Sequence, residues 1–240
     1  MIASVTRRWL LCREPRPDAG IRLYIFPHSG SSPGEYIRWS DGLPGVEVHG
    51  VQLPGRGTRF REPPFTRMTD LVDAITGEVR FQAPYAFFGH SLGGLIAYEV
   101  ARRLRDRGDT PPGVLMVSGL DPPHLQPPRR LPPARVTERM IQRLPGQQLG
   151  PDCLKADLNV LRSYVHTPSP PLPGPIVVLG GTDDDQPEDL GAWSGYGRGP
   201  AEIRLFPGGH HYHREHHDDL HPYLLDALRR HRPDAAEPDQ

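Results

Sequence analysis

This chain of 240 residues has almost no excess of one charge over the other, few cysteines and no long hydrophobic runs. Its 28 basic and 29 acidic residues give a formal net charge of -1, so no one-sided electrostatic field attracts nucleic acid or an anionic membrane surface. The two cysteines, Cys12 and Cys153, form neither a metal-binding spacing nor a CxxC redox pair. The sequence therefore predicts reduced thiols, no nucleic-acid partner and no membrane partner.

Signals for export or membrane insertion are also missing from the sequence. No run approaches the roughly 20 apolar residues that a membrane-spanning helix requires. Residues 1–18 contain only a very short apolar stretch followed by charge and proline, which is unlike a signal peptide. We therefore expect a cytoplasmic protein.

Proline and glycine are abundant, with 30 and 26 copies, and they divide the chain into short segments. Near-continuous apolar runs between them are typical of strands that helices cover on both faces. The runs span residues 21–26, 46–53, 85–89, 114–119, 176–181 and 201–206, and residues 9–12 could add an edge strand. Segments with helical periodicity alternate with them. The pattern predicts a single α/β domain over residues 1–240, with a mainly parallel sheet flanked by helices.

The helical segments are expected at residues 68–79, 92–104 and 213–231. Thr69 is a possible N-cap of the first. In the second, an apolar stripe faces the core, and Glu99 and Arg102 are expected to face water together with the neighbouring arginines.

Residues 121–135 interrupt the alternation, because they contain six prolines and cannot form a regular element. We expect an irregular excursion there, then a short helix near residues 136–144 and a second helix near 152–165. The last ten residues or so, about 231–240, resemble a disordered tail.

Residues 85–104 read YAFFGHSLGGLIAYEVARRL, an apolar run followed by G-x-S-x-G and an amphipathic helix. In this context the pattern indicates the nucleophile turn of an α/β-hydrolase fold. Gly89 and Gly93 are needed because a side chain at either position would clash with the neighbouring strand or helix. Ser91 then lies at a helix N-terminus, where free N–H groups favour a developing negative charge. We predict that Ser91 is a nucleophile, the alternative being an ordinary loop serine.

A serine nucleophile needs a histidine base and an acid, which follow in the order Ser, Asp or Glu, His in this fold. Asp183, Asp184 and Asp185 follow a late strand, and Asp184 is the preferred acid among the three. His210 and His211 follow the last strand, and His210 is the preferred base because it comes directly after two glycines. The sequence leaves Asp183, Asp185 and His211 as alternatives.

An oxyanion hole needs two N–H groups. Leu92, the residue after the nucleophile, supplies one of them. The other should come from the small, Gly-rich loop over residues 24–32, where Ser29 or Gly30 would donate. His28 is expected to be a structural residue that forms hydrogen bonds within this loop.

Histidines near the C-terminus suggest a second type of site. His213, His217 and His221 are spaced four residues apart, so two neighbouring pairs could share a helix face and hold a metal ion. No H-E-x-x-H motif is present. The simpler interpretation is a solvent-exposed, pH-sensitive helix.

Five stretches together resemble the type II thioesterases, the stand-alone editing hydrolases of polyketide and nonribosomal peptide synthases. They are IFPHSG (25–30), VQLPGRGTRFREPP (51–64), FFGHSLGGLIAYEVARRL (87–104), LKADLNVLRSYVH (154–166) and FPGGHHY (206–212). The resemblance spans nearly the whole chain. It departs from the family in two places: the region before residue 154 is short and rich in proline, and HHY replaces the usual HFF.

This resemblance implies an α/β-hydrolase fold with a short helical lid, here a lid insertion at about residues 120–165, over an acyl pocket. It implies hydrolysis of thioesters on the phosphopantetheine arm of acyl or peptidyl carrier proteins, which would be the partners. No cofactor and no metal ion are needed, and we expect a monomer.

Residue by residue, Ser91 matches the family's nucleophile, Asp184 its acid and His210 its base. The amides of Ser29 and Leu92 match its oxyanion hole. Two alternative functions remain open: another acyl esterase or chain-releasing thioesterase on the same fold, and a non-enzymatic protein that only binds carrier domains.

Overall fold

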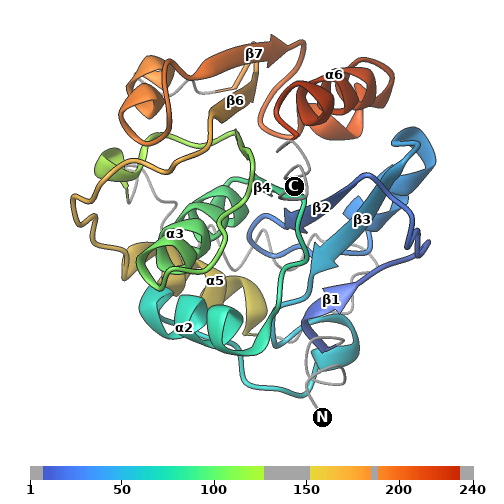
Figure 1. Ribbon diagram of the computed structural model, residues 1–240. Helices are drawn as coiled ribbons and strands as arrows, with labels where there is room; N and C mark the ends of the chain where they lie inside the picture. The colour runs from blue at the N-terminus through green and yellow to red at the C-terminus, as the bar shows by residue number, and fades with distance from the viewer. Residues whose placement is uncertain (1–7, 127–151, 185–188, 233–240) are drawn as a thin grey trace, which may run out of the picture.

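Residues 8–126, 152–184 and 189–232 are described by a computed structural model (Figure 1). Within them, seven strands form one sheet in the order β1-β3-β2-β4-β5-β6-β7. The strands are β1 (Leu10–Leu11), β2 (Ile21–Phe26), β3 (Val46–Val51), β4 (Tyr85–His90), β5 (Leu115–Ser118), β6 (Ile176–Gly181) and β7 (Glu202–Phe206). β1 is antiparallel to β3, and all other neighbours are parallel. The predicted mainly parallel sheet with an added edge strand is confirmed.

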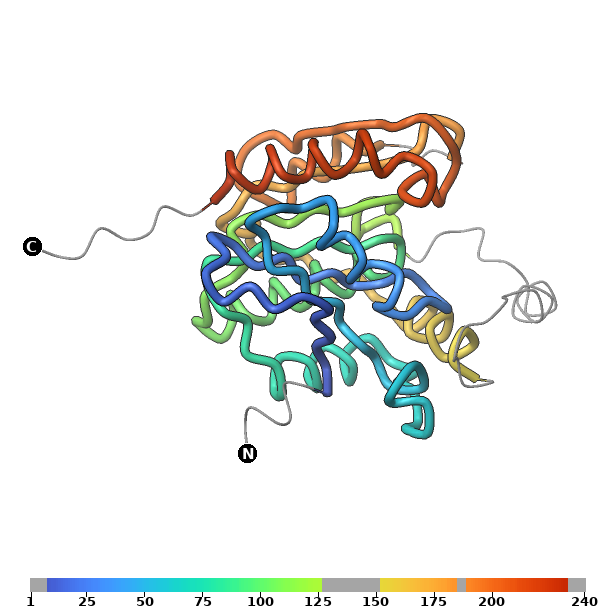
Figure 2. The backbone as a smooth tube through the Cα atoms, turned by 90° about the vertical axis from the view of Figure 1, so that its right-hand side faces the viewer, coloured from blue at the N-terminus to red at the C-terminus, as the bar shows by residue number. Residues whose placement is uncertain are grey.

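Side chains of the central strands alternate between two apolar layers, as the two-residue period of a strand requires. In β2, Tyr24 and Phe26 join one core cluster, whereas Leu23 and Ile25 join the other. The first face is covered by α2 (Met68–Glu78), α3 (Leu92–Asp106) and α5 (Cys153–Arg162), and the second by η1 (Tyr36–Gly42) and α6 (His217–Arg230). Figure 2 shows α6 in red on the opposite side of the molecule from α2 and α5. The predicted α/β-hydrolase architecture is confirmed.

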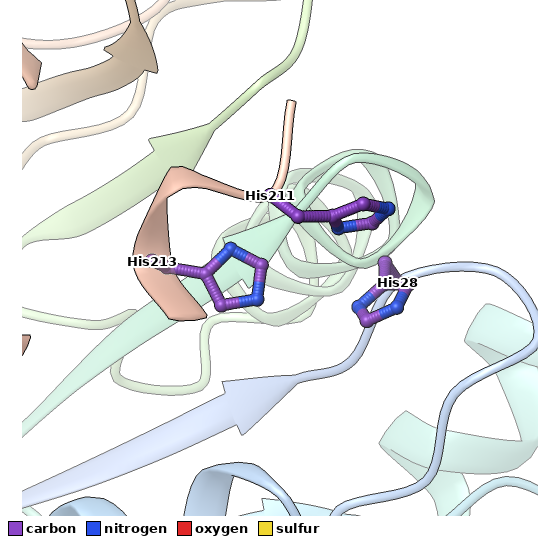
Figure 3. Close-up of side chains that lie close together, drawn as sticks. All are labelled: His28, His211 and His213. Atoms are coloured by element: carbon purple, nitrogen blue, oxygen red, sulfur yellow. The ribbon is translucent and has the colours of Figure 1, made fainter. Parts of the chain in front are cut away.

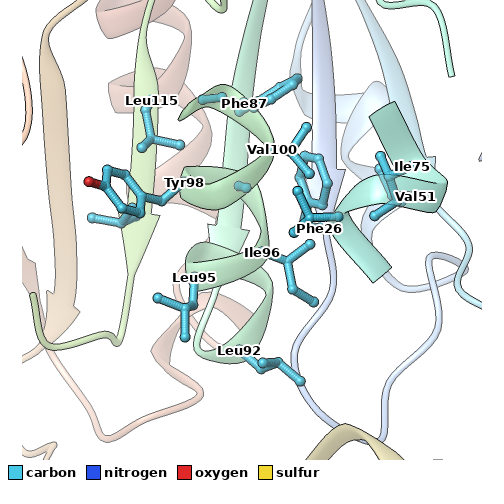
Figure 4. Packing of buried hydrophobic residues seen from close by; sticks show 14 of the residues in the cluster. Phe26, Val51, Ile75, Phe87, Leu92, Leu95, Ile96, Tyr98, Val100 and Leu115 are labelled. Atoms are coloured by element: carbon cyan, nitrogen blue, oxygen red, sulfur yellow. The ribbon is translucent and has the colours of Figure 1, made fainter. Parts of the chain in front are cut away.

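The apolar stripe of α3 packs against the sheet (Figure 4). Leu92, Leu95, Ile96 and Val100 are all buried and belong to the same core cluster as Phe87 of β4. Each such side chain contributes about 1.5–3 kcal/mol by leaving water. Since α3 begins directly after Ser91, this packing fixes the helix whose N-terminus faces the candidate site.

The prediction that Glu99 and Arg102 face water is wrong. Their side chains are only 15% and 11% exposed, and they form an ion pair with a 2.8 Å contact. Tyr164, in the segment after α5, donates its hydroxyl hydrogen bond to Glu99 at 2.7 Å. The polar face of α3 is therefore covered by a part of the chain more than sixty residues away, which helical periodicity cannot reveal.

The N-cap predicted for α2 is also wrong. The helix begins at Met68 with Arg67 in the cap position, and Thr69 lies inside the helix. The Met68 N–H donates to Ser163 Oγ at 3.2 Å. An orphan N–H at this helix start is thus satisfied by a side chain that follows α5 rather than by a local cap.

The remaining helices follow the sequence in part. α5 lies within the helix expected near residues 152–165, whereas α6 begins at His217 instead of residue 213. The short helix expected near 136–144, most of the expected lid, and residues 233–240 of the expected tail lie outside the described residues. In the part of the chain that is described, no helix has both the length and the apolar character needed to cross a membrane.

Candidate active site

The turn between β4 and α3 holds Ser91 in a backbone conformation that is rare outside glycine. Its φ is 52° and its ψ is -124°. The Ser91 N–H donates to the Ser118 carbonyl oxygen at 2.8 Å, which fixes the turn against β5. A Cβ added to Gly89 would overlap the Gly93 carbonyl, and one added to Gly93 would overlap the Phe26 carbonyl at the end of β2. These clashes are the physical reason for both glycines of the G-x-S-x-G pattern.

An acid and a base meet at the carboxyl ends of β6 and β7. His210 Nδ1 lies 2.9 Å from Asp184 Oδ2, and the Asp184 side chain is only 14% exposed. Asp183 is exposed and accepts a hydrogen bond from the adjacent threonine, and Asp185 lies outside the described residues. His211 lies on the surface. The geometry therefore favours Asp184 and His210 over the described alternatives.

His90 connects the nucleophile turn to His210. It immediately precedes Ser91, and its ring centroid is 4.8 Å from that of His210. A Cβ built on Gly119 would meet the rings of both His90 and His210, at 2.8 and 3.1 Å, so this glycine allows the two imidazoles to approach. Among the described residues there is no Ser91–His210 hydrogen bond. Such bonds are often long in a substrate-free site and shorten when substrate binds.

The backbone amides predicted for the oxyanion hole lie in two loops. Leu92 is the first residue of α3, so its N–H has no acceptor within the helix. In the loop after β2, the Gly30 N–H donates to Asp157 Oδ2 at 2.8 Å. Because that donor is occupied, Ser29 is the better of the two donors that the sequence left open.

Several imidazoles beside His210 are kept neutral by burial. Burial lowers the pKa of His28 to about 2, and it lowers the pKa of His90 and His213 as well. His90 Nδ1 is 2.9 Å from Ser118 Oγ, which in turn lies 2.7 Å from the Tyr212 hydroxyl. A proton gained at this edge of the sheet therefore has little tendency to move onto these buried rings.

Three histidines gather next to this site (Figure 3). Nitrogen atoms of His28, His211 and His213 lie within 4.8 Å of one another. One nitrogen of His28 is 2.6 Å from the tyrosine hydroxyl of η1, and the other is 3.4 Å from the Arg214 guanidinium. His213 Nε2 lies 3.3 Å from Glu35. A guanidinium this close opposes a bound cation, so the cluster is better described as a polar network.

His28 also departs slightly from its prediction. It has the expected structural role, but its tyrosine partner lies in η1, beyond the loop over residues 24–32.

A second group with metal-ligating atoms lies near the edge of the sheet. Cys12, Glu47 and His49 each offer an atom within 4.8 Å of the others. Glu47 already accepts hydrogen bonds from His49 at 3.0 Å and from Arg22 at 3.1 Å. Its charge is thus balanced without a metal ion.

The histidine pairs predicted at the C-terminus do not form one exposed face. His213 is fully buried in the turn before α6, whereas the rings of His217 and His221 lie 5.0 Å apart beside Trp39. Burial lowers the pKa of His221 to about 4. The interpretation as a solvent-exposed helix is therefore wrong for His213. His217 and His221 are half-buried because they pack against Trp39.

Sequence reasoning assigned no role to Arg56 and Asp157. Both are buried, and Arg56 Nη2 lies 2.6 Å from Asp157 Oδ1. The only signal was indirect: each residue lies in one of the stretches, 51–64 and 154–166, that carry the family resemblance. A buried ion pair whose partners are 101 residues apart leaves no periodic pattern in a sequence.

Comparison with known proteins assigns the chain to a family. Residues 21–229 match the family model described as "Thioesterase domain". The chain belongs to the thioesterase family. It is similar to the gramicidin S biosynthesis protein GrsT of Aneurinibacillus migulanus, with 28% identity over 245 residues that cover 94% of this chain and 96% of that protein.

Two further relatives support the same assignment. The thioesterase PikA5 of Streptomyces venezuelae is 32% identical over 223 residues, covering 85% of this chain and 79% of that protein. The solved structure of the type II thioesterase BorB from the borrelidin biosynthetic cluster has 31% identity and a TM-score of 0.80, covering 92% of this chain and 96% of that one. The resemblance to type II thioesterases is confirmed, and the chain is a hydrolase that acts on thioesters.

Proposed function

We propose that this thioesterase hydrolyses acyl groups from the phosphopantetheine arm of acyl or peptidyl carrier proteins, and so edits misprimed or stalled polyketide or nonribosomal peptide synthases. The chemistry of the proposal rests chiefly on the 2.9 Å hydrogen bond between His210 Nδ1 and Asp184 Oδ2, next to the turn that presents Ser91. The pathway context rests on the relatives, one of which is named for a biosynthetic cluster and another for gramicidin S biosynthesis.

Each member of the proposed triad has a role that its position supports. The bond to Asp184 keeps the proton on His210 Nδ1 and leaves Nε2 as the base. His210 Nε2 takes the proton from Ser91 Oγ as the oxygen attacks the thioester carbonyl. Asp184 then stabilises the imidazolium that forms.

The tetrahedral intermediate carries a negative oxygen that needs two donors. The amides of Leu92 and Ser29 supply them, and Leu92 adds the positive end of the α3 dipole. The carrier thiol leaves with the proton from His210, which produces an acyl-Ser91 ester. Water, deprotonated by the same histidine, hydrolyses this ester and restores the free serine.

The remaining parts of the proposal concern setting and access. The protein acts as a cytoplasmic monomer, and a helical lid over about residues 120–165 limits the acyl chains that can enter. Neither cofactor nor metal ion takes part in these steps.

The test compares three substrates that carry the same acetyl group: acetyl-phosphopantetheinyl carrier protein, an acetyl thioester of N-acetylcysteamine, and a simple aryl acetate. We expect kcat/KM to be highest for the carrier-bound thioester, and His210→Ala and Ser91→Ala to abolish turnover of all three. If the aryl ester is cleaved while the carrier-bound thioester persists, the chain is a different acyl esterase on this fold.

A further inference from the structure

A buried ion pair joins Arg56, in the segment after β3, to Asp157 of α5. Arg56 donates to both carboxylate oxygens of Asp157, from Nη1 to Oδ2 at 3.0 Å and from Nη2 to Oδ1 at 2.6 Å. Both side chains are almost completely buried, at 2% and 4% exposure. Charge-assisted bidentate pairs of this kind hold their partners in a fixed orientation.

The same pair forms hydrogen bonds to two consecutive residues of the loop after β2. Asp157 Oδ2 accepts the Gly30 N–H at 2.8 Å, and Arg56 Nη1 donates to the Ser31 carbonyl at 3.0 Å. The Ser31 N–H returns to the His28 carbonyl at 3.1 Å, and Gly30 has a φ of 69°, as in the third residue of a type II turn. The bonds from Arg56 and Asp157 therefore lock a turn whose second residue is Ser29.

Close packing against α5 also restricts this turn. A Cβ added to Gly30 would come within 3.0 Å of Leu154 on α5, so the helix is in close contact with the loop backbone. With Gly30 held on one side and His28 held by the turn bond and by the tyrosine of η1, the direction of the Ser29 N–H is set.

We propose that Asp157, oriented by Arg56, is a positioning residue that keeps the Ser29 amide aligned as an oxyanion donor. This inference rests on the proposed function, because it assumes that Ser29 stabilises the tetrahedral intermediate. Neither side chain touches the substrate. Their effect passes through the Gly30 and Ser31 backbone.

The charge balance of the pair explains why an arginine accompanies the carboxylate. A lone carboxylate close to the oxyanion loop would repel the negative charge that develops in the transition state. The bidentate guanidinium cancels that charge, and it leaves Asp157 free to accept the Gly30 hydrogen bond. An arrangement that served only to bury the loop would not need an ion pair, since apolar side chains of similar volume often serve as well.

The test uses three variants of the full chain with the acetyl thioester of N-acetylcysteamine as the probe. Asp157→Asn breaks the bidentate pairing with little change in shape. Arg56→Met combined with Asp157→Leu replaces the pair by apolar side chains. Arg56→Lys keeps the positive charge but not the two-pronged contact, and it is the mildest change if the others fail to fold. Glu202→Gln, which breaks a distant ion pair with Arg230, is the matched control.

For each variant, kcat, KM, the melting temperature and the rate of fluorophosphonate labelling of Ser91 are measured. We expect kcat and the labelling rate to fall about 10- to 100-fold in Asp157→Asn, with KM changed less than about threefold, since an oxyanion donor acts mainly in the transition state. Arg56→Lys should lose about three- to tenfold in kcat. The apolar double variant should have a melting temperature near that of the wild type, but its kcat should stay low.

If the pair had a purely structural role, kcat and the melting temperature would recover together. If the double variant recovers kcat together with its melting temperature, or if folded Arg56→Lys keeps the kcat of the wild type, the inference is wrong. Failure of the proposed function is distinguishable, because the wild type would then leave the carrier-bound acetyl thioester intact, whatever the variants do to the small thioester.

Discussion

Replacing Ser91 by glycine is expected to give a more stable fold than replacing it by alanine, although both changes remove the proposed nucleophile. Ser91 is the one non-glycine residue with positive φ among the described residues. A non-glycine residue in such a sparsely populated region costs of order 1–3 kcal/mol. Glycine adopts the conformation without that cost, but it loses about 0.5–1 kcal/mol more than alanine in backbone entropy on folding. The net gain of Ser91→Gly over Ser91→Ala is thus about 1 kcal/mol.

This difference is large enough to measure. For a chain of this length, 1 kcal/mol shifts the melting temperature by about 2–4 °C. Thermal unfolding of the wild type, Ser91→Ala and Ser91→Gly, followed by circular dichroism or calorimetry, gives the comparison. Both variants lack the hydroxyl, so any hydrogen bond that it makes is lost equally from both.

Ser169 provides the matched control, because it lies in a loop with an ordinary φ. There glycine should be no more stable than alanine. If Ser91→Gly melts at or below the temperature of Ser91→Ala, the strain attributed to the nucleophile turn is absent, and the turn is held at no energetic cost.

Three further predictions concern other parts of the molecule. Asp184→Asn should lower kcat about 10³- to 10⁴-fold by releasing the His210 tautomer, and steady-state kinetics showing less than a tenfold loss would contradict this. Leu95→Ala should lower the free energy of unfolding in urea by about 2–5 kcal/mol through the cavity it leaves under α3, and a loss below 1 kcal/mol would argue against that packing. Hydrogen bonds from Arg230 lower the pKa of Glu202 from 4.5 to about 2, so the stability that Glu202 contributes is present above pH 4.5 and lost as pH falls toward 2. The difference in unfolding free energy between wild type and Glu202→Gln, measured across that range, should therefore shrink as pH falls; a difference that grows would contradict this.

Most of the sheet was predictable because its central strands are buried on both faces. Residues 21–26 and 176–181 are near-continuous apolar runs bounded by glycine or proline, and the strands found there begin and end at the same residues. The nucleophile turn was predictable for a related reason. Its glycines are required by direct backbone contacts, so their spacing is visible in the sequence.

The meeting of Asp184 and His210, the proposed acid and base, was predictable from topology more than from local chemistry. Each residue follows a late strand, and the parallel strands end at the same edge of the sheet as β4, which leads into Ser91. The sequence prefers Asp184 but leaves Asp183 open, because adjacent carboxylates differ only in direction; the hydrogen bond to His210 is what separates them.

Contacts between distant segments were not predictable. Ser163 caps α2, Tyr164 covers Glu99, and Asp157 holds the loop after β2. All three residues belong to α5 or the segment just after it, which meets parts of the chain 65 to 127 residues away. A single sequence contains no periodicity that links such segments, so helix caps and polar faces assigned from local patterns failed where α5 and its continuation dock.

The central claim is that Ser91 accepts the acyl group from a carrier protein. Single-turnover mixing of acetyl-phosphopantetheinyl carrier protein with excess enzyme, quenched in acid and read by intact-protein mass spectrometry, follows both proteins at once. The account predicts rapid loss of acetyl from the carrier and a transient acetyl adduct on the wild-type enzyme, with neither event in Ser91→Ala. Deacetylation of the carrier by Ser91→Ala at the wild-type rate would contradict it.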